Sequence, residues 1–236
     1  MVVALGMSFL ATSVNATVVL NFAGLDGANT EAVRDYYNGG SGGGPSGDGA
    51  GGSTGGTNYG ISFSINATAC SGLPTGCETT AIPSGLGANA LTFASGEGDV
   101  MNVAAGFITG FSFFYSAPQQ GGAVEVWSGL DATGTLLASI TLDLTQDGNL
   151  LTGPALDACT VETQVAGYCP FSPVGVTFLG TARSVNFAGG ADYILFADIT
   201  LGSQTAGDTG APEPASLALL GIGIAGLGVI RRFRRA

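Results

Sequence analysis

The chain has 236 residues, of which 41 are glycine and only 10% are charged, and it contains neither histidine nor lysine. Their absence excludes Ser-His-Asp and Cys-His catalysis, histidine-ligated zinc, and Schiff-base or P-loop lysines. Residues 17–210 carry 16 acidic residues and two arginines, a net charge of −14. This charge would repel a phosphate backbone, so we expect no nucleic-acid partner. Carboxylate chemistry remains, but no spacing singles out a catalytic Asp or Glu pair, so we do not expect an enzyme.

Residues 1–16 are mostly apolar or small and end in Val14-Asn15-Ala16. This ending meets the small-residue rule for signal peptidase, so we predict a signal peptide that is cleaved after Ala16. The alternative is that the segment forms a first buried strand. A signal peptide makes signal peptidase a partner and implies export.

Between residues 17 and 203, short apolar runs alternate with glycine-rich turns, and no segment has the 3.6-residue period of an amphipathic helix. The pattern predicts an all-β domain, a two-sheet antiparallel sandwich of jelly-roll type, with a barrel as the alternative. The predicted strands cover residues 17–22, 59–65, 90–94, 100–104, 110–116, 123–128, 135–144, 174–179, 184–187 and 193–201.

Residues 38–60 contain about a dozen glycines and no aliphatic side chain except that of Ala50. The stretch is too long and too polar to pack, so we predict a loop. Its simplest interpretation is a solvated excursion. The functional alternatives are a flexible rim beside a binding face, or a cation cradle that uses Asp48.

The four cysteines are an even number, as disulfides in an exported chain require. Of the three pairings, we predict Cys70 with Cys77 and Cys159 with Cys169, because these close the shortest loops. A metal role is the weaker interpretation, since no histidine or C-x-x-C motif accompanies the cysteines.

Aromatic side chains offer two interpretations, as stacking surfaces for sugars or as core residues. The candidates for stacking are Trp127, Tyr36, Tyr37, Tyr59 and Tyr115. We expect most of the aromatic residues to be core, because the alternation of aromatics in 110–116 is what a sandwich interior needs.

Asp198 lies in the last predicted strand, while Asn21 and Asp26 lie near the first. Jelly-roll sugar-binding modules often hold calcium between their first and last strands. By this analogy Asp198 is a candidate calcium ligand, with Asn21 or Asp26 as its partner. Calcium is the one cofactor that the sequence suggests.

After an expected linker at 204–211, the chain reads Pro212-Glu213-Pro214, then an uncharged run of 16 residues at 215–230. The prolines keep the tripeptide extended and open to an enzyme. A helix over 215–230 reaches about 24 Å and spans a bilayer only if its flanking arginines snorkel or the bilayer thins. Those arginines should stay cytoplasmic, with the acidic body outside; they are Arg231, Arg232, Arg234 and Arg235.

Pro-Glu-Pro, an apolar helix and a terminal arginine cluster, together residues 212–236, resemble the PEP-CTERM sorting signal of Gram-negative bacteria. The resemblance implies that exosortase, a membrane-embedded transpeptidase-like enzyme, recognises Pro212, Glu213 and Pro214, removes the helix, and passes the protein to the cell surface or extracellular matrix. It also implies an association with exopolysaccharide and biofilm. The alternative is a C-terminal anchor that is never cut.

The body resembles, more loosely, the ectodomains often found before such signals, through Tyr37-Asn38-Gly39-Gly40 and Asn58-Tyr59-Gly60-Ile61. The resemblance favours a shared sandwich fold and identifies no ligand. We therefore expect an exported, exosortase-sorted surface protein without enzymatic activity. The alternatives are a calcium-dependent carbohydrate-binding module and, third, a carboxylate glycosidase.

Overall fold

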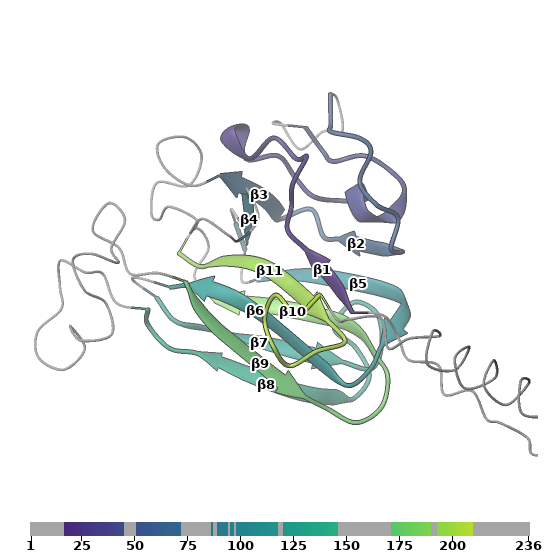
Figure 1. Cartoon of the computed structure of the whole chain (residues 1–236), viewed down its shortest axis with the longest axis vertical. Coiled ribbons are helices and arrows are strands. Elements are labelled where there is room, and N and C mark those ends of the chain that lie inside the picture. Colours follow the sequence, from purple (N-terminus) through teal and green to yellow (C-terminus); the bar gives the residue numbers. More distant parts are fainter. Residues whose placement is uncertain are drawn as a thin grey trace, which may run out of the picture. The chain divides into compact units, whose positions relative to one another are not determined.

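A computed structural model describes residues 17–44, 51–71, 86, 89–93, 95–96, 98–117, 120–145, 171–189 and 193–209. These residues form one compact unit, 17–209, built from antiparallel strands in two sheets (Figure 1). The predicted all-β, two-sheet antiparallel sandwich is therefore confirmed. The predicted signal peptide and the helix at 215–230 lie outside the described residues.

Eleven strands and two short 3-10 helices make up the described part of the unit. They are β1 Val18–Leu20, η1 Gly27–Asn29, η2 Tyr36–Asn38, β2 Ile61–Phe63, β3 Ala67–Ser71, β4 Asn89–Phe93, β5 Gly98–Phe107, β6 Gly110–Ser116, β7 Gly122–Trp127, β8 Leu136–Leu142, β9 Ser172–Thr177, β10 Ala182–Gly189 and β11 Leu195–Leu201.

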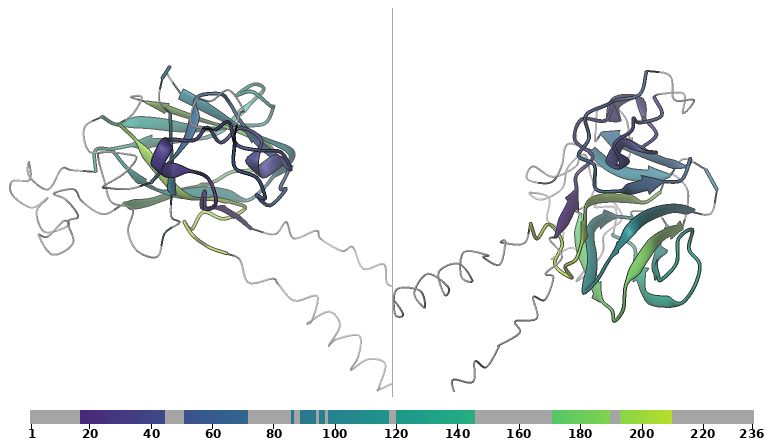
Figure 2. Two further views of the ribbon diagram at one scale, coloured as in Figure 1. Left: turned by 90° about the horizontal axis from the view of Figure 1, so that it is seen from above. Right: turned by 90° about the vertical axis from the view of Figure 1, so that its right-hand side faces the viewer.

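The first sheet has the order β3-β4-β11-β6-β9, with β1 also pairing with β11. The second sheet has the order β2-β5-β10-β7-β8. From β4 onward, successive strands pass from one sheet to the other except between β7 and β8, as in a jelly roll. The layered arrangement is visible in both views of Figure 2.

The core between the sheets is rich in phenylalanine because alternate residues of each strand point inward. On β6, Phe111 and Phe113 are fully buried. Phe196 of β11 lies with its ring centroid 5.4 Å from that of Phe113 and 4.9 Å from that of Phe187 on β10. Each such ring contributes about 1.5–3 kcal/mol by leaving water. These contacts join the two sheets at the centre of the sandwich.

Three of the candidate stacking residues belong to this interior. Tyr36, Tyr37 and Tyr115 are each at most 8% exposed. The hydroxyl of Tyr37 accepts a hydrogen bond of 2.8 Å from the backbone N–H of Phe22. The expectation that most aromatic residues serve packing is confirmed for these three.

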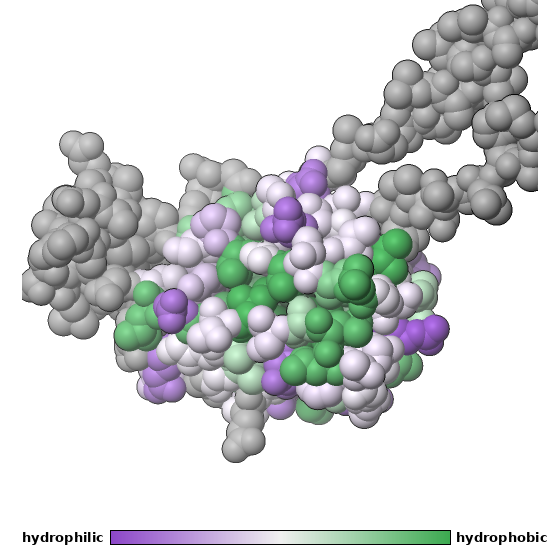
Figure 3. All heavy atoms as spheres, turned by 90° about the horizontal axis from the view of Figure 1, so that it is seen from below, coloured by the Kyte–Doolittle hydropathy of each residue, from purple (hydrophilic) through white to green (hydrophobic). Residues whose placement is uncertain are grey.

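The open edge of the second sheet is strand β8, which pairs only with β7 among the described strands. Its residues carry no charge, and Leu136 is 44% exposed. Figure 3, which views the molecule from below, shows apolar surface gathered between polar patches. On the facing sheet, edge strand β9 contains Pro173, which cannot donate to a further strand.

The glycine-rich stretch has no strand in its described residues, 38–44 and 51–60, but it packs against the domain, so the expectation of a solvated excursion is wrong for these residues. Glu31 is 1% exposed and accepts hydrogen bonds from the N–H of Ser53 at 2.6 Å and from the Ser53 hydroxyl at 2.6 Å. The backbone N–H of Gly42 donates to the carbonyl of Ser53 at 2.9 Å. Glycine permits this packing because a Cβ on Gly52 would lie 1.9 Å from the carbonyl oxygen of Gly42. Asp48 lies outside the described residues.

The start of the linker expected at 204–211 also needs correction. Residues 203–209 fold onto the first sheet and belong to the domain. The Ser112 hydroxyl donates to the carbonyl of Ser203 at 2.9 Å, and the N–H of Gly207 donates to the Thr200 hydroxyl at 3.0 Å. Gly175 on β9 lets Gln204 pass close by, since a Cβ there would lie 2.1 Å from the Gln204 carbonyl oxygen. The folded unit therefore reaches Thr209.

Strand β3 was not predicted, because its sequence ATACS lacks large β-branched or aromatic residues. It forms because β4 pairs along its whole length, and its other edge is covered by residues 31–33 through the Ala32–Thr68 bridge.

Within the described part of the chain, no helix has the length and apolar composition needed to cross a bilayer.

Candidate functional site: a cleft beside strand β11

A β-bulge at Asp198 interrupts strand β11. Ala197 pairs with Phe114 of β6, but the next paired residue is Thr200, opposite Ser112. Asp198 takes the left-handed conformation, with φ of 48°, which costs a non-glycine residue about 1–2 kcal/mol. The bulge resets the alternation of the strand, so that Phe196 and Ile199 both face the main core.

The neighbour of β11 changes at the same point. Phe196 pairs with Leu91 of β4, whereas residues 199–201 pair with β1. β4 and β1 therefore lie on the same side of β11, and Asp198 is located between the residues of β11 that pair with each of them. A cleft of about 510 Å³ lies here, lined by Thr17, Val18, Val19, Asn21, Tyr59, Leu86, Asp198, Gly207 and Thr209.

Tyr59 enters the cleft from the end of the glycine-rich stretch. Its N–H donates to the carbonyl of Tyr37 at 2.9 Å, and its ring lies at 6.2 Å between centroids from the ring of Tyr37. The residue is nevertheless 39% exposed. The buried Tyr37 thus holds an exposed aromatic ring at the cleft.

Thr200, which is fully buried, connects two parts of the lining. Its hydroxyl donates to the carbonyl of Asp198 at 2.8 Å and accepts from the N–H of Gly207 at 3.0 Å. One side chain therefore links the bulge to the 203–209 segment, which supplies Gly207 and Thr209 to the lining.

Asp198 contributes negative charge to the cleft and is itself only 9% exposed. Burial raises the pKa of the neighbouring Tyr37 above its ordinary value, and the charge of Asp198 adds to the rise. Asp198 is the one charged residue among the described residues that line the cleft.

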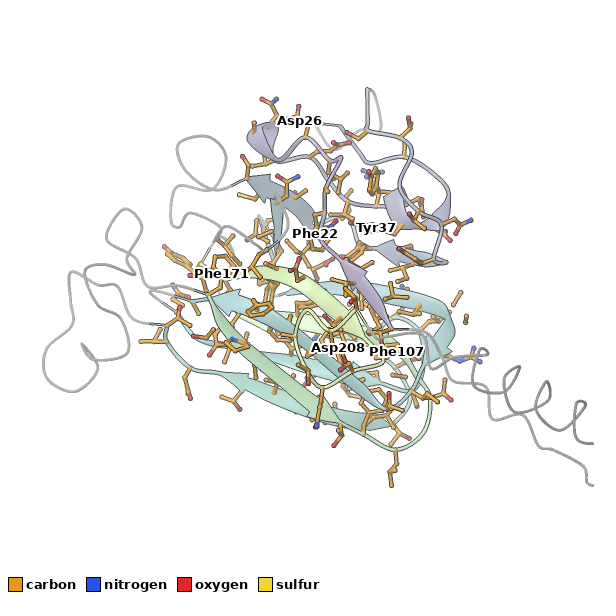
Figure 4. All side chains as sticks on the ribbon, in the orientation of Figure 1. Phe22, Asp26, Tyr37, Phe107, Phe171 and Asp208 are labelled. Atoms are coloured by element: carbon orange, nitrogen blue, oxygen red, sulfur yellow. The ribbon has the colours of Figure 1, made fainter. Side chains whose placement is uncertain are left out.

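The candidate calcium ligands are brought together in part. Leu20 pairs with Ile199 in antiparallel register, which places the next residue, Asn21, beside Asp198, and both line the cleft. Asp26 lies elsewhere, in the loop that Figure 4 shows away from β11, where its carboxylate accepts a 2.7 Å hydrogen bond from Asn29. The described residues contain no group of three or more His, Cys, Asp or Glu side chains that could hold a metal ion.

A second carboxyl group with an unusual environment, Asp99 on β5, does not line the cleft. It is 1% exposed and pairs across the sheet with Phe187. Burial raises its pKa to about 7, an effect that the hydroxyl and backbone hydrogen bonds around it only partly oppose. Asp99 is therefore a group of the core.

The other predicted site residues lie outside the described part of the chain, with one exception. The sorting residues Pro212, Glu213 and Pro214, the four terminal arginines, and Cys77, Cys159 and Cys169 are all outside it. Cys70 is buried near the end of β3. The pairings of Cys70 with Cys77 and of Cys159 with Cys169 stay predictions.

Sequence reasoning identified Asn21, Tyr59 and Asp198 singly and missed the rest of the cleft. Val18 and Val19 fall in the first predicted strand, and Gly207 and Thr209 fall in the expected linker, so the sequence alone does not mark them as site residues. The one signal of the cleft in the sequence is Asp198, an acidic residue within the apolar run of β11. No sequence pattern shows the left-handed backbone conformation of this residue.

Comparison with known proteins identifies the C-terminal segment. The family model of the PEP-CTERM protein-sorting motif matches residues 211–235. The chain thus carries this motif at its C-terminus, which implies a secreted, membrane-anchored precursor that exosortase processes for the cell surface.

The folded body has more distant likenesses. A solved structure of a family 6 carbohydrate-binding module is similar with a TM-score of 0.34 and 14% identity, over 59% of this chain and 83% of that one. The search of curated proteins found no match.

Proposed function

We propose that this chain is an exported protein that exosortase cuts after Pro212-Glu213-Pro214 and delivers to the cell surface or an exopolysaccharide matrix. The single observation that carries the proposal is the sorting motif at residues 211–235. The terminal arginines favour an orientation with the acidic body on the periplasmic side of the inner membrane before cleavage.

The exported body acts by binding or by structural occupancy and not by hydrolysis. Glycoside hydrolysis usually needs two carboxyl groups about 5–9.5 Å apart across one cleft. The described lining of the cleft beside β11 supplies one, Asp198. A carboxylate glycosidase is therefore the least supported of the three functions.

A glycan-binding module is the second candidate, and the cleft favours it because an exposed aromatic ring and polar side chains meet there. A calcium-dependent form has weaker support, since Asn21 and Asp198 are brought together without Asp26. Calcium usually takes six to eight oxygen ligands.

The processing step is tested by mass spectrometry of the surface protein in cells with and without exosortase. We expect the surface form to end before Ala215, and we expect cells without exosortase, and a Glu213→Ala variant, to retain the residues 215–236. Asp208→Asn, a carboxylate change just outside the motif, is the matched control and should be processed normally. Recovery of an intact arginine-rich C-terminal peptide from the surface form would contradict the proposal.

A further inference from the structure

We infer that the cleft beside β11 is a binding site for a neutral saccharide, which it holds against Tyr59 without calcium. The inference deepens the second candidate function and concerns only the folded body, so its outcome is independent of whether exosortase cuts the chain.

The cleft is built into the sheet by the exchange of β4 for β1 beside β11 and by the bulge at Asp198. Its volume of about 510 Å³ lies within the ~300–1,000 Å³ typical of small-ligand sites. Thr200 holds two of its walls together through hydrogen bonds of 2.8 and 3.0 Å. These hydrogen bonds fix the position of the bulge relative to Gly207.

The lining of the cleft contains the two kinds of group that bind a sugar ring, an aromatic side chain and polar side chains. A pyranose has faces of C–H groups, which pack on aromatic rings, and a rim of hydroxyl groups, which donate and accept hydrogen bonds. Tyr59 supplies an aromatic ring with 39% of the residue exposed. Val18, Val19 and Leu86 are the apolar residues of the described lining.

The polar part of the lining can bond sugar hydroxyls in both directions. An ionised carboxylate such as that of Asp198 only accepts hydrogen bonds. The Asn21 amide can both donate and accept, and its Oδ1 already accepts the N–H of Ala23 at 3.1 Å. Thr17 and Thr209 add hydroxyl groups at the same cleft.

Charge selects a neutral saccharide over an anionic one. The described lining contains Asp198 and no arginine, and residues 17–210 carry a net charge of −14. A uronate or sulfated sugar would meet like charge in the cleft and around it. Calcium could offset this charge, but Asp198 is the one carboxylate among the described residues that line the cleft, and calcium sites in proteins usually contain several.

The test is isothermal titration of the full chain in a detergent without a sugar headgroup. The probes are neutral hexasaccharides of glucose, mannose and xylose, with hexagalacturonate as the anionic comparison, each with and without EDTA. We expect at least one neutral probe to bind, with no change on adding EDTA and no binding of hexagalacturonate. Tyr59→Ala should weaken that binding about tenfold or more, whereas Tyr59→Phe should retain it.

Three further variants serve as controls for this test. Ile65→Ala removes an apolar side chain that is 68% exposed and outside the cleft, and it should bind as the native chain does. If Tyr59→Ala does not fold, as judged by thermal unfolding, then Asn21→Ala carries the test and should bind at least threefold more weakly. The inference is overturned if no neutral probe binds, if EDTA abolishes binding, if hexagalacturonate binds better, or if Trp127→Ala rather than Tyr59→Ala removes binding.

Discussion

Asp99 is an ionisable group on the inward face of β5, in line with Met101 and Val103. The Ser64 hydroxyl donates to its Oδ1, while its Oδ2 is buried without a hydrogen-bond partner. A buried carboxylate with an unsatisfied oxygen is costly, and protonation removes the charge. This is the physical reason that burial raises the pKa of Asp99 to about 7.

The elevated pKa makes stability depend on pH in the direction opposite to that of most carboxylates. The unfolded chain has the ordinary Asp pKa of 3.8, so between pH 4 and 7 the folded chain binds a proton that the unfolded chain has lost. The contribution of Asp99 to stability is therefore complete below about pH 4 and is lost as the pH rises through 7. The loss amounts to about 4 kcal/mol for the full shift.

We expect Asp99→Asn, which cannot ionise, to gain stability relative to the native chain as the pH rises from 4 to 8. Denaturant unfolding at several pH values measures this difference in the free energy of unfolding. Asp143→Asn removes one exposed carboxylate and is the control for a general change in net charge. Parallel curves for Asp99→Asn and the native chain would show that Asp99 does not titrate in this range.

At the scale of elements, the glycine-rich stretch is a packed layer whose close contacts exclude side chains. A Cβ on Gly56 would lie 2.3 Å from the carbonyl oxygen of Tyr36, whereas a Cβ on the adjacent Gly55 would meet no atom within 4 Å. Gly55 has a φ of 90°, so its glycine serves backbone conformation. Substitution of Gly56 therefore tests the steric cost of a side chain, whereas substitution of Gly55 tests the cost of the left-handed backbone conformation.

We expect Gly56→Ala to lower the free energy of unfolding by about 2–3 kcal/mol, because the Tyr36 backbone has to move. Gly55→Ala should cost only about 1 kcal/mol, the penalty of a left-handed backbone. Chemical denaturation of both variants measures the difference. Equal, small losses would indicate that the stretch moves away from Tyr36 without cost.

Most strands could be predicted, because a sandwich interior requires alternation and the sequence shows it clearly in 110–116, which is β6. What the sequence did not show was contact between distant segments. The ladder of β4 stabilises β3 against its weak local preference, and the buried Glu31 holds Ser53, 22 residues away. The cleft depends on such contacts too, since its lining comes from five stretches of the chain.

For the whole molecule, the distribution of charge gives the precursor and the cleaved surface form different net charges. Four of the six arginines lie in the last six positions, and the complete chain has a net charge of −11. Residues 17–214 keep all 17 acidic residues but only two arginines, a net charge of −15. Removal of the tail therefore makes the protein more acidic while it becomes smaller.

We expect the surface form to focus at a lower pH than the precursor that accumulates without exosortase. Two-dimensional electrophoresis of the two forms measures the shift, because loss of four guanidinium groups outweighs any change in side-chain titration. The precursor of an Arg231→Gln, Arg232→Gln double variant gives an intermediate reference. Identical positions in both dimensions would mean that the tail is retained.

The pairing of β1 with β11 also determines how the domain responds to mechanical force. Val18 pairs with Leu201 in antiparallel register, and Thr17 and Thr209 line the same cleft, so the described chain enters and leaves the domain at one end of this ladder. A force applied between Thr17 and Thr209 would act on the hydrogen bonds of residues 203–209, and within the β1–β11 ladder it would load the Val18–Leu201 pair before the Leu20–Ile199 pair. Strand β1 would then peel away one residue at a time, at lower force than a ladder whose hydrogen bonds are sheared together.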